Sequence, residues 1–282
     1  MRSTAKKFLK DTSAVIGAGV VFALLVTAIF APYLAPYPED VRKVHPMQRL
    51  EPPSWKHPFG TDDVGRDLLS RVIFGTRVTI IIVFSATSIS MVIGVLMGIF
   101  AGYYPGWLSM AAMRIADIFL SIPQIILAIA LAHALGPSIP NLILAIALTY
   151  WPLFTRIVYA ETMSIKGRLF VEATLAIGAK NFRVIALHAF PNLMPSIVVR
   201  TTIGMGTVIL VAAVLGFLGV GAQPPTPEWG LMVANSREYL PDAWWFATFP
   251  GMAIFVVVMA FNMFGDGLRD IIDPKLRRSS RK

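Results

Sequence analysis

The sequence has no cysteine and few charged residues. Of its 282 residues none is Cys, and 15% are Asp, Glu, Lys or Arg, whereas soluble domains carry about 25% charge. Without cysteine there can be no disulfide scaffold, thiol catalysis or Cys-based metal site. The low charge argues against a water-soluble globule. Because 56% of the residues are hydrophobic, the composition also excludes a disordered chain, which combines low hydrophobicity with high charge.

Motifs of nucleotide-binding and metal-dependent enzymes are also missing. No Gly-Lys pair occurs, which excludes a Walker A phosphate-binding loop, and there is no His-Glu-x-x-His motif. The histidines are scattered without the spacing of metal ligands, at His45, His57, His133 and His188. We therefore expect no catalytic residue, no metal site and no bound cofactor in this chain.

The excess of positive charge does not indicate a nucleic-acid partner. The formal net charge is +9, from 25 basic and 16 acidic residues. A nucleic-acid binder spreads its basic residues over a water-facing surface, but here they cluster between long apolar runs. We expect a lipid bilayer, and no nucleic acid, around this protein.

Long charge-free stretches dominate the chain. They are Thr12–Pro38, Val78–Met113, Ile118–Thr155, Thr201–Pro227 and Ala243–Gly265. A membrane-spanning helix needs about 20 apolar residues. Turn-forming residues at 102–107 and 136–141 divide the two longest stretches, so that separate helices are expected near Val78–Ala101, Met110–Leu135 and Leu142–Tyr159. The fold class predicted is an all-α membrane protein with six transmembrane helices.

Lys and Arg cluster in three regions that an even number of spans places on one side. By the positive-inside rule that side, with both termini, is cytoplasmic. The expected division is a cytoplasmic N-terminal segment (1–13), a first transmembrane helix (14–36), an extracytoplasmic segment (37–77), a transmembrane core (78–266) and a basic cytoplasmic tail (267–282). The first span is longer than the core of a signal peptide, so we expect an uncleaved anchor.

The segment 167–192 reads as two short amphipathic helices. Leu169–Ile177 contains good helix formers and ends at Gly178, which can take a positive φ. Asn181 can cap the second helix, which should stop before Pro191. We interpret the apolar stretch 184–199 as an interfacial or partner-docked segment, not a further span. Either a membrane surface or a partner's groove can cover these apolar faces, and periodicity does not choose between them.

Residues in this segment resemble a known signature. Glu172-Ala173-Thr174, with Gly178 six residues after Glu172 and Pro191 beyond, is similar to the EAA loop of binding-protein-dependent ABC importer permeases. Thr174 and Lys180 depart from the usual pattern. The resemblance implies a coupling loop (162–198) whose first helix sits in a cleft of a cytosolic ATPase. The residues that it implies for ATPase coupling are Phe170, Glu172, Ala173, Gly178, Ala179 and Pro191.

Three further blocks resemble the C-type permease subunit of dipeptide and oligopeptide importers. They are His57–Arg71, Leu215–Gly230 and Phe261–Asp270. The first suggests a turn followed by a charge-laced helix, and Gln223–Pro227 suggests a stiff, extended linker. We interpret these residues as an extracytoplasmic docking or gating element, comprising Gly60, Asp62, Asp63, Gly65, Arg66, Asp67, Gln223, Pro224, Pro225, Glu228 and Trp229.

The resemblance implies the permease subunit of a type I ABC importer in a bacterial or archaeal plasma membrane. Its partners would be a homologous B-type permease, two ATPases that bind ATP and Mg, and an extracytoplasmic binding protein that delivers peptide. A self-sufficient carrier or channel, and a scaffold that transports nothing, remain alternatives. Relatives carry dipeptides, oligopeptides, nickel chelates or haem, and dipeptides are favoured here. Tyr150, Trp151 and Met205 are candidates for lining a path, and no substrate ligand can be named.

Overall fold

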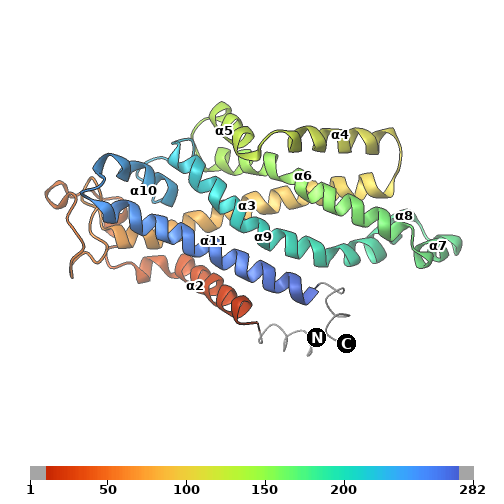
Figure 1. Cartoon of the computed structure of the whole chain (residues 1–282), viewed down its shortest axis with the longest axis horizontal. Coiled ribbons are helices and arrows are strands. Elements are labelled where there is room, and N and C mark those ends of the chain that lie inside the picture. The colour runs from red at the N-terminus through yellow and green to blue at the C-terminus, as the bar shows by residue number, and fades with distance from the viewer. Residues whose placement is uncertain (1–10, 273–282) are drawn as a thin grey trace.

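The computed structural model describes residues 11–272, which contain helices, turns and no named strand. Long helices run along the longest axis of the molecule (Figure 1). They are α2 (Thr12–Leu34), α3 (Leu68–Tyr103), α6 (Ile139–Lys166), α9 (Phe190–Phe217) and α11 (Trp244–Ile272). In the described part of the chain, five helices are long and apolar enough to cross a membrane, or six if one bent pair forms a span.

The bent pair corrects the third predicted span. A single helix was expected over 110–135, but α4 (Trp107–Ser121) and α5 (Gln124–Leu135) meet at an angle of 94°. Ile122 and Pro123 between them have extended ψ angles of 131° and 122°. Proline lacks an N–H and pushes the residue before it out of the helical region. The helix therefore breaks at Ile122 and Pro123.

The backbones of helices α3 and α6 come into close contact along a row of glycines. A Cβ atom added to Gly94 would lie 2.5 Å from the carbonyl oxygen of Trp151, and one added to Gly98 would lie 2.8 Å from that of Thr155. At Gly102 the carbonyl oxygen of Tyr159 would be 2.7 Å away. In the sequence, glycines at this four-residue spacing predict close helix packing, and the structure confirms it.

The buried apolar residues form two clusters at different levels of the bundle. The larger one joins α3, α6, α9 and α11, with Leu68, Ile82, Leu142, Ile209 and Phe246 among its members. The second contains Val95, Tyr103, Val158, Val171 and Leu193. Because Val171 lies in the short helix α7 (Leu169–Ala176), the second cluster anchors that helix to the membrane bundle.

The prediction that a helix stops before Pro191 is wrong. Helix α8 (Asn181–Val184) continues through a π-helical turn, η3 (Ile185–Ala189), into α9, whose first turn contains Pro191. Together 181–217 form one candidate span, so 184–199 is not a separate interfacial segment. The Phe190 N–H donates to the Ile185 carbonyl in the wider π pattern, and such turns insert a residue into a helix without ending it.

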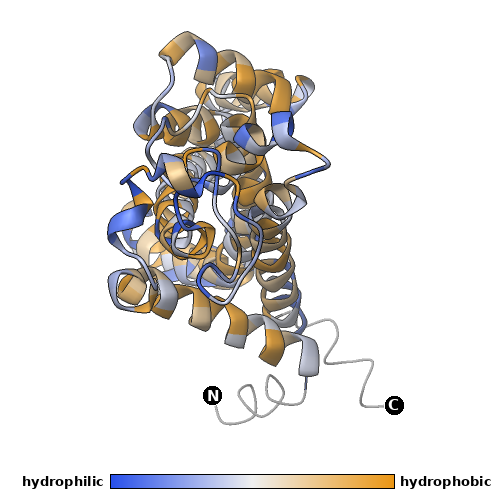
Figure 2. Cartoon of the chain, turned by 90° about the vertical axis from the view of Figure 1, so that its left-hand side faces the viewer, coloured by the Kyte–Doolittle hydropathy of each residue, from blue (hydrophilic) through white to orange (hydrophobic). Residues whose placement is uncertain are grey.

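The two ends of the bundle differ in character. One end, here called the α10 end, carries the segment 35–67, with η1 (Glu39–Val41) and η2 (Pro46–Gln48), and the short helices α10 (Trp229–Ser236) and η4 (Arg237–Tyr239). Figure 2 shows hydrophilic residues gathered in the loops of this end, over apolar helices. The other end carries α7 and α8 and is called the α7 end. Helix α11 runs from the α10 end toward the α7 end, and α2 starts near the middle of the long axis (Figure 1). The basic clusters predicted within 1–10 and 273–282 lie outside the described residues.

Candidate functional site

Helix α7 ends as the sequence predicts. Its last residues are followed by Gly178 with φ 87°, whose N–H donates to the Leu175 carbonyl at 2.9 Å. A positive φ is unfavourable for residues with a Cβ atom, so glycine suits this turn. The chain then reverses into α8, and the two short helices form a hairpin spanning 169–184, here called the α7–α8 hairpin.

One side of the α7–α8 hairpin is buried and the rest is exposed. Val171 is fully buried, and Leu175 packs against the same cluster. Large apolar side chains point away from the bundle: Leu169 is 82% exposed, Ile177 85% and Phe182 80%. Glu172 and Ala173 are exposed beside them. The hairpin therefore presents an apolar surface that nothing in residues 11–272 covers.

Asn181 does not cap the second helix as predicted. The N-cap residue of α8 is Lys180, without a side-chain cap, and the Asn181 amide oxygen instead accepts a hydrogen bond from the Tyr103 hydroxyl at 3.1 Å. The Lys166 ammonium donates to the Tyr103 carbonyl at 2.7 Å and lies 5.2 Å from its ring centroid. These contacts tie the hairpin to the ends of α3 and α6.

The structure brings most of the predicted coupling residues to this protruding element. Phe170, Glu172, Ala173 and Gly178 are exposed on or next to α7, and Ala179 is half-buried. Pro191 is exposed in the first turn of α9. The Phe170 ring centroid lies 5.9 Å from that of His188, which precedes Pro191 by three residues, so the two parts of the motif are neighbours.

At the opposite end, the predicted docking element is a tightly bonded cap. The Asp62 carboxylate accepts hydrogen bonds from the N–H groups of Val64 and Arg66, at 3.0 and 2.9 Å, and pairs with the Arg66 guanidinium at 2.6 Å. Asp62 is fully buried and Arg66 is 5% exposed. Gly60 and Gly65 take φ angles of 74° and 81°, and a Cβ atom on Gly65 would overlap the His45 carbonyl.

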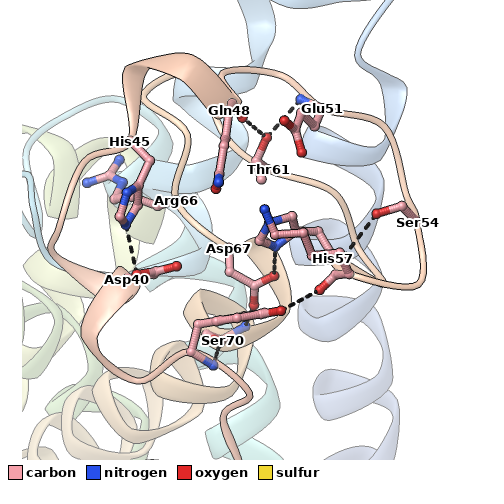
Figure 3. Close-up of polar contacts among 12 residues, drawn as sticks. Asp40, His45, Gln48, Glu51, Ser54, His57, Thr61, Arg66, Asp67 and Ser70 are labelled. Atoms are coloured by element: carbon pink, nitrogen blue, oxygen red, sulfur yellow. Dashed lines mark hydrogen bonds and ion pairs between the residues drawn. The ribbon is translucent and has the colours of Figure 1, made fainter.

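Asp67 starts helix α3 in this cap. Its carboxylate accepts from the Ser70 N–H at 2.8 Å and contacts the His57 ring nitrogen Nδ1 at 2.8 Å (Figure 3). A turn followed by a helix was expected and is found, but the helix begins at Leu68, before the charge-free run. The expected exposed row of charged side chains is not found here, because Asp67 and His57 are buried. Burial, and then the neighbouring Asp62, raise the pKa of the half-buried Asp63.

Arg71 joins three parts of the cap and was not among the predicted site residues. Its guanidinium donates to the Val41 carbonyl at 2.6 Å and to the Pro225 carbonyl at 3.2 Å, and its Nε lies 3.4 Å from Asp62. The side chain is 1% exposed. The sequence could have identified Arg71 by its position, since it lies four residues after the helix-capping Asp67 in a chain with few charged residues.

The segment after α9 is a turn rather than the expected extended linker. The Thr226 N–H donates to the Gln223 carbonyl at 3.0 Å, and the peptide bond between Pro224 and Pro225 is cis. Gln223, Pro224 and Pro225 are exposed. Of the predicted docking residues, these three are the ones exposed on the surface of this chain.

Glu228 and Trp229 fix α10 onto α3. The Glu228 carboxylate accepts from the N–H groups of Gly230 at 2.9 Å and Leu231 at 2.7 Å, while burial raises its pKa to about 7. The Trp229 indole N–H donates to the Val72 carbonyl at 3.0 Å. Both side chains are buried, so they build the cap and do not themselves offer a docking surface.

The residues suggested for a transport path are buried within this chain. Tyr150 is 1% exposed, Trp151 5% and Met205 8%. A Cβ atom on Gly204 would lie 2.5 Å from the Tyr150 hydroxyl, so α6 packs closely on α9 here. Within residues 11–272 no group of three or more His, Asp and Glu side chains is placed to hold a metal ion.

A bundle of apolar helices with an uncovered hairpin at one end and a rigid cap at the other defines a multi-pass membrane protein built to join other subunits. The sequence matches the family described as binding-protein-dependent transport system inner membrane component over residues 94–278. Residues 1–53 match the N-terminal TM domain of oligopeptide transport permease C. The chain belongs to the binding-protein-dependent transport system inner membrane component family, and it is a multi-pass plasma-membrane protein.

Curated relatives are similar along almost the whole chain. The dipeptide transport system permease protein DppC of Alkalihalophilus pseudofirmus is 43% identical, over 98% of this chain and 90% of the relative. The di/tripeptide transport system permease protein DppC of Pseudomonas aeruginosa is 41% identical over 93% and 88%. The glutathione transport system permease protein GsiD of Pectobacterium atrosepticum is 40% identical over 96% and 90%.

A solved structure shares the fold. The inward-facing MetNI methionine ABC transporter matches with a TM-score of 0.58 and 21% identity, over 72% of this chain and 96% of the matched chain. The predicted type I ABC importer permease fold is thereby confirmed.

Proposed function

We propose that this chain is the permease subunit of an ATP-driven peptide importer, with dipeptides as the first candidate substrate and oligopeptides as the next. The observation that carries the proposal is the α7–α8 hairpin, whose exposed apolar residues are held on a buried anchor. The names of the dipeptide, di/tripeptide and glutathione permeases support a small peptide as cargo.

The position of the hairpin favours a protein groove over a membrane surface as its cover. Helix α6 has 28 residues and α3 has 36, and at 1.5 Å per residue both exceed the roughly 30 Å of hydrocarbon in a bilayer. The hairpin follows the end of α6 and contacts the end of α3 through Tyr103. Its apolar side chains therefore lie beyond the hydrocarbon, where a protein partner is needed to cover them.

The proposal includes the partner subunits. Two ATPase subunits, which bind ATP and Mg, receive the hairpin of this chain and that of a homologous B-type permease. The translocation path lies between the two permeases, and an extracytoplasmic binding protein delivers the peptide at the α10 end. In this proposal the α7 end is cytoplasmic, which agrees with the orientation predicted from the distribution of Lys and Arg.

The hairpin is built to transmit movement. Val171 and Leu175 pack in the cluster that also holds Val158 and Leu193 of α6 and α9. A displacement of α7 by a closing ATPase pair would therefore move both helices, and the Tyr103–Asn181 hydrogen bond would add α3. The chain itself performs no covalent chemistry, and the energy comes from ATP hydrolysed by the partner subunits.

Reconstituted vesicles test the proposal with paired readouts, peptide uptake and ATP hydrolysis. Replacing Glu172→Ala, or Gly178→Val at a positive φ that disfavours a Cβ atom, should abolish ATP-dependent uptake while membrane insertion is retained. Glu238→Ala is the matched control, because Glu238 is exposed at the opposite end. Unchanged uptake in both hairpin variants would overturn the proposal, and uptake without ATP or other subunits would establish a self-sufficient carrier instead.

A further inference from the structure

A cavity of about 790 Å³ opens at the α10 end, beside the start of α3. Its walls come from η1 and the residues after it, from α3, and from the turn that precedes Glu228. The lining includes the cations Arg42, Lys43 and Arg77, the acid Glu39, and the apolar side chains Phe74 and Val78. The cations outnumber the carboxylate, so the cavity suits an anion.

These cations are unpaired within the part of the chain that the structure describes. Arg42, Lys43 and Arg77 are exposed, and among residues 11–272 none of their side chains makes a hydrogen bond or an ion pair. Other arginines near this end have partners: Arg66 and Arg71 lie on Asp62, and Arg49 donates to the Tyr239 hydroxyl. No ion pair within the described residues therefore neutralises these three cations around the cavity.

The cavity sits at the boundary between water and hydrocarbon. Arg77 directly precedes the charge-free run that begins at Val78, and charged side chains mark the ends of membrane-embedded segments. On the same face of α3, exposed apolar residues follow the cavity: Ile81 is 51% exposed, Phe84 38%, Val92 52% and Leu96 64%. The exposed Ser88 is the one polar residue between Phe84 and Val92 on this face. A cationic cavity above an exposed apolar stripe matches a molecule with an anionic head and an apolar tail.

We propose that this cavity binds the phosphate headgroup of an anionic phospholipid, whose acyl chain lies along the apolar stripe of α3. The cations hold the phosphate, and Phe74 and Val78 contact the glycerol and the first methylene groups. The bound lipid joins the loop after α2 to the turn after α9, because both contribute to the walls. The site is separate from the hairpin and does not depend on the cargo.

Photo-crosslinking tests the site on the purified full chain with its co-purifying subunits in mild detergent. A photoreactive phosphatidylglycerol is titrated, and labelled peptides are mapped by mass spectrometry. Label is expected in 38–43, 74–84 and 226–227. Each cation near a lipid phosphate contributes about 1 kcal/mol, so Arg77→Gln should weaken binding about fivefold, and the triple variant Arg42→Gln, Lys43→Gln, Arg77→Gln about a hundredfold. Lys56→Gln, an exposed lysine outside the cavity, is the control and should not change the affinity.

Each contrary result overturns the proposal. Equal affinity in the wild type and in Arg77→Gln shows that the cations do not bind the lipid, and this single variant decides the matter if the triple variant fails to fold. Displacement of the lipid by an equal concentration of free glycerol phosphate shows a site for soluble anions. Label confined to another subunit, with these peptides protected, shows that a protein fills the cavity.

Discussion

Glu228 is a carboxylic acid placed where water does not reach it. It is 3% exposed, yet it accepts two backbone N–H groups at the start of α10. Burial disfavours the charged form more than the two hydrogen bonds favour it, so the pKa rises from 4.5 to about 7. A residue chosen from the sequence as part of a docking surface is thus a buried, titrating helix cap.

The raised pKa predicts a dependence of stability on pH. Between the unfolded value of 4.5 and the native value of about 7, the native state binds more protons than the unfolded state, so the contribution of Glu228 to stability falls as pH rises through this window. Glu228→Gln should therefore reduce the loss of melting temperature between about pH 5 and pH 8. Thermal unfolding of the purified chain measures this, with exposed Glu238→Gln as control; identical pH slopes in wild type and Glu228→Gln would refute it.

At the same scale, the cap shows what single residues reveal in a sequence and what they hide. The glycines at 60, 65 and 178 could be recognised, because a positive φ is a local property of the backbone. The burial of Asp62, Asp67 and Arg71 could not, because it depends on which distant segments fold over them: Arg71 bonds to Val41, and also to Pro225, more than 150 residues later. A short charged motif has the same sequence whether its side chains are exposed to solvent or buried and bonded to one another.

Among the described elements, the α3–α6 pair makes the most extensive contact in the bundle. Gly94, Gly98 and Gly102 each face backbone atoms of α6. The sequence predicted this packing, because glycines four residues apart share one helix face. Proline was less informative: Pro123 marks a break, whereas Pro152, Pro195 and Pro250 lie inside long helices. Neighbouring helices and local turns decide how a membrane helix accommodates each proline.

The glycine row predicts that a larger side chain at one of its positions strongly reduces the stability of the folded protein. In Gly98→Val, the added Cβ would lie 2.7 Å from the Val158 Cβ and 2.8 Å from the Thr155 carbonyl, forcing the helices apart at a cost of about 1–3 kcal/mol or more. We expect a lower melting temperature and a lower yield of assembled complex. Gly19→Ala is the control, because a Cβ atom there meets nothing within 4 Å and alanine favours a helix. Equal losses in both variants would contradict the role of the row.

Across the whole molecule, the two surfaces proposed to meet partners lie at opposite ends of one bundle. The apolar hairpin occupies the α7 end, and the polar cap, with exposed Trp55 and Met47, occupies the α10 end (Figures 1 and 2). The number of spans and the family could be inferred from hydropathy and motif spacing, which depend on residues near one another in the chain. The packing of the cap could not, because it joins 35–67 to the segment around 225.

This separation predicts that changes at one end leave binding at the other intact. Replacing Ile177→Asp, 85% exposed on the hairpin, should weaken retention of the ATPase subunits about tenfold or more, since a buried apolar contact contributes about 1–2 kcal/mol. Trp55→Ala, at the α10 end and fully exposed, should retain them as the wild type does. Co-purification at graded salt and detergent measures both, and equal retention in Ile177→Asp would show that the hairpin is not the docking surface.

The glycine row has one more consequence, for how the molecule changes shape. At successive helical turns, side chains and carbonyls of α6 fill the gaps that Gly94, Gly98 and Gly102 leave on α3, so the two helices cannot slide along each other without a clash at each turn. We expect them to rotate as one rigid body. Bending is then left to the 94° break between α4 and α5 and to the π-helical turn before α9, which become the hinges of the transport cycle.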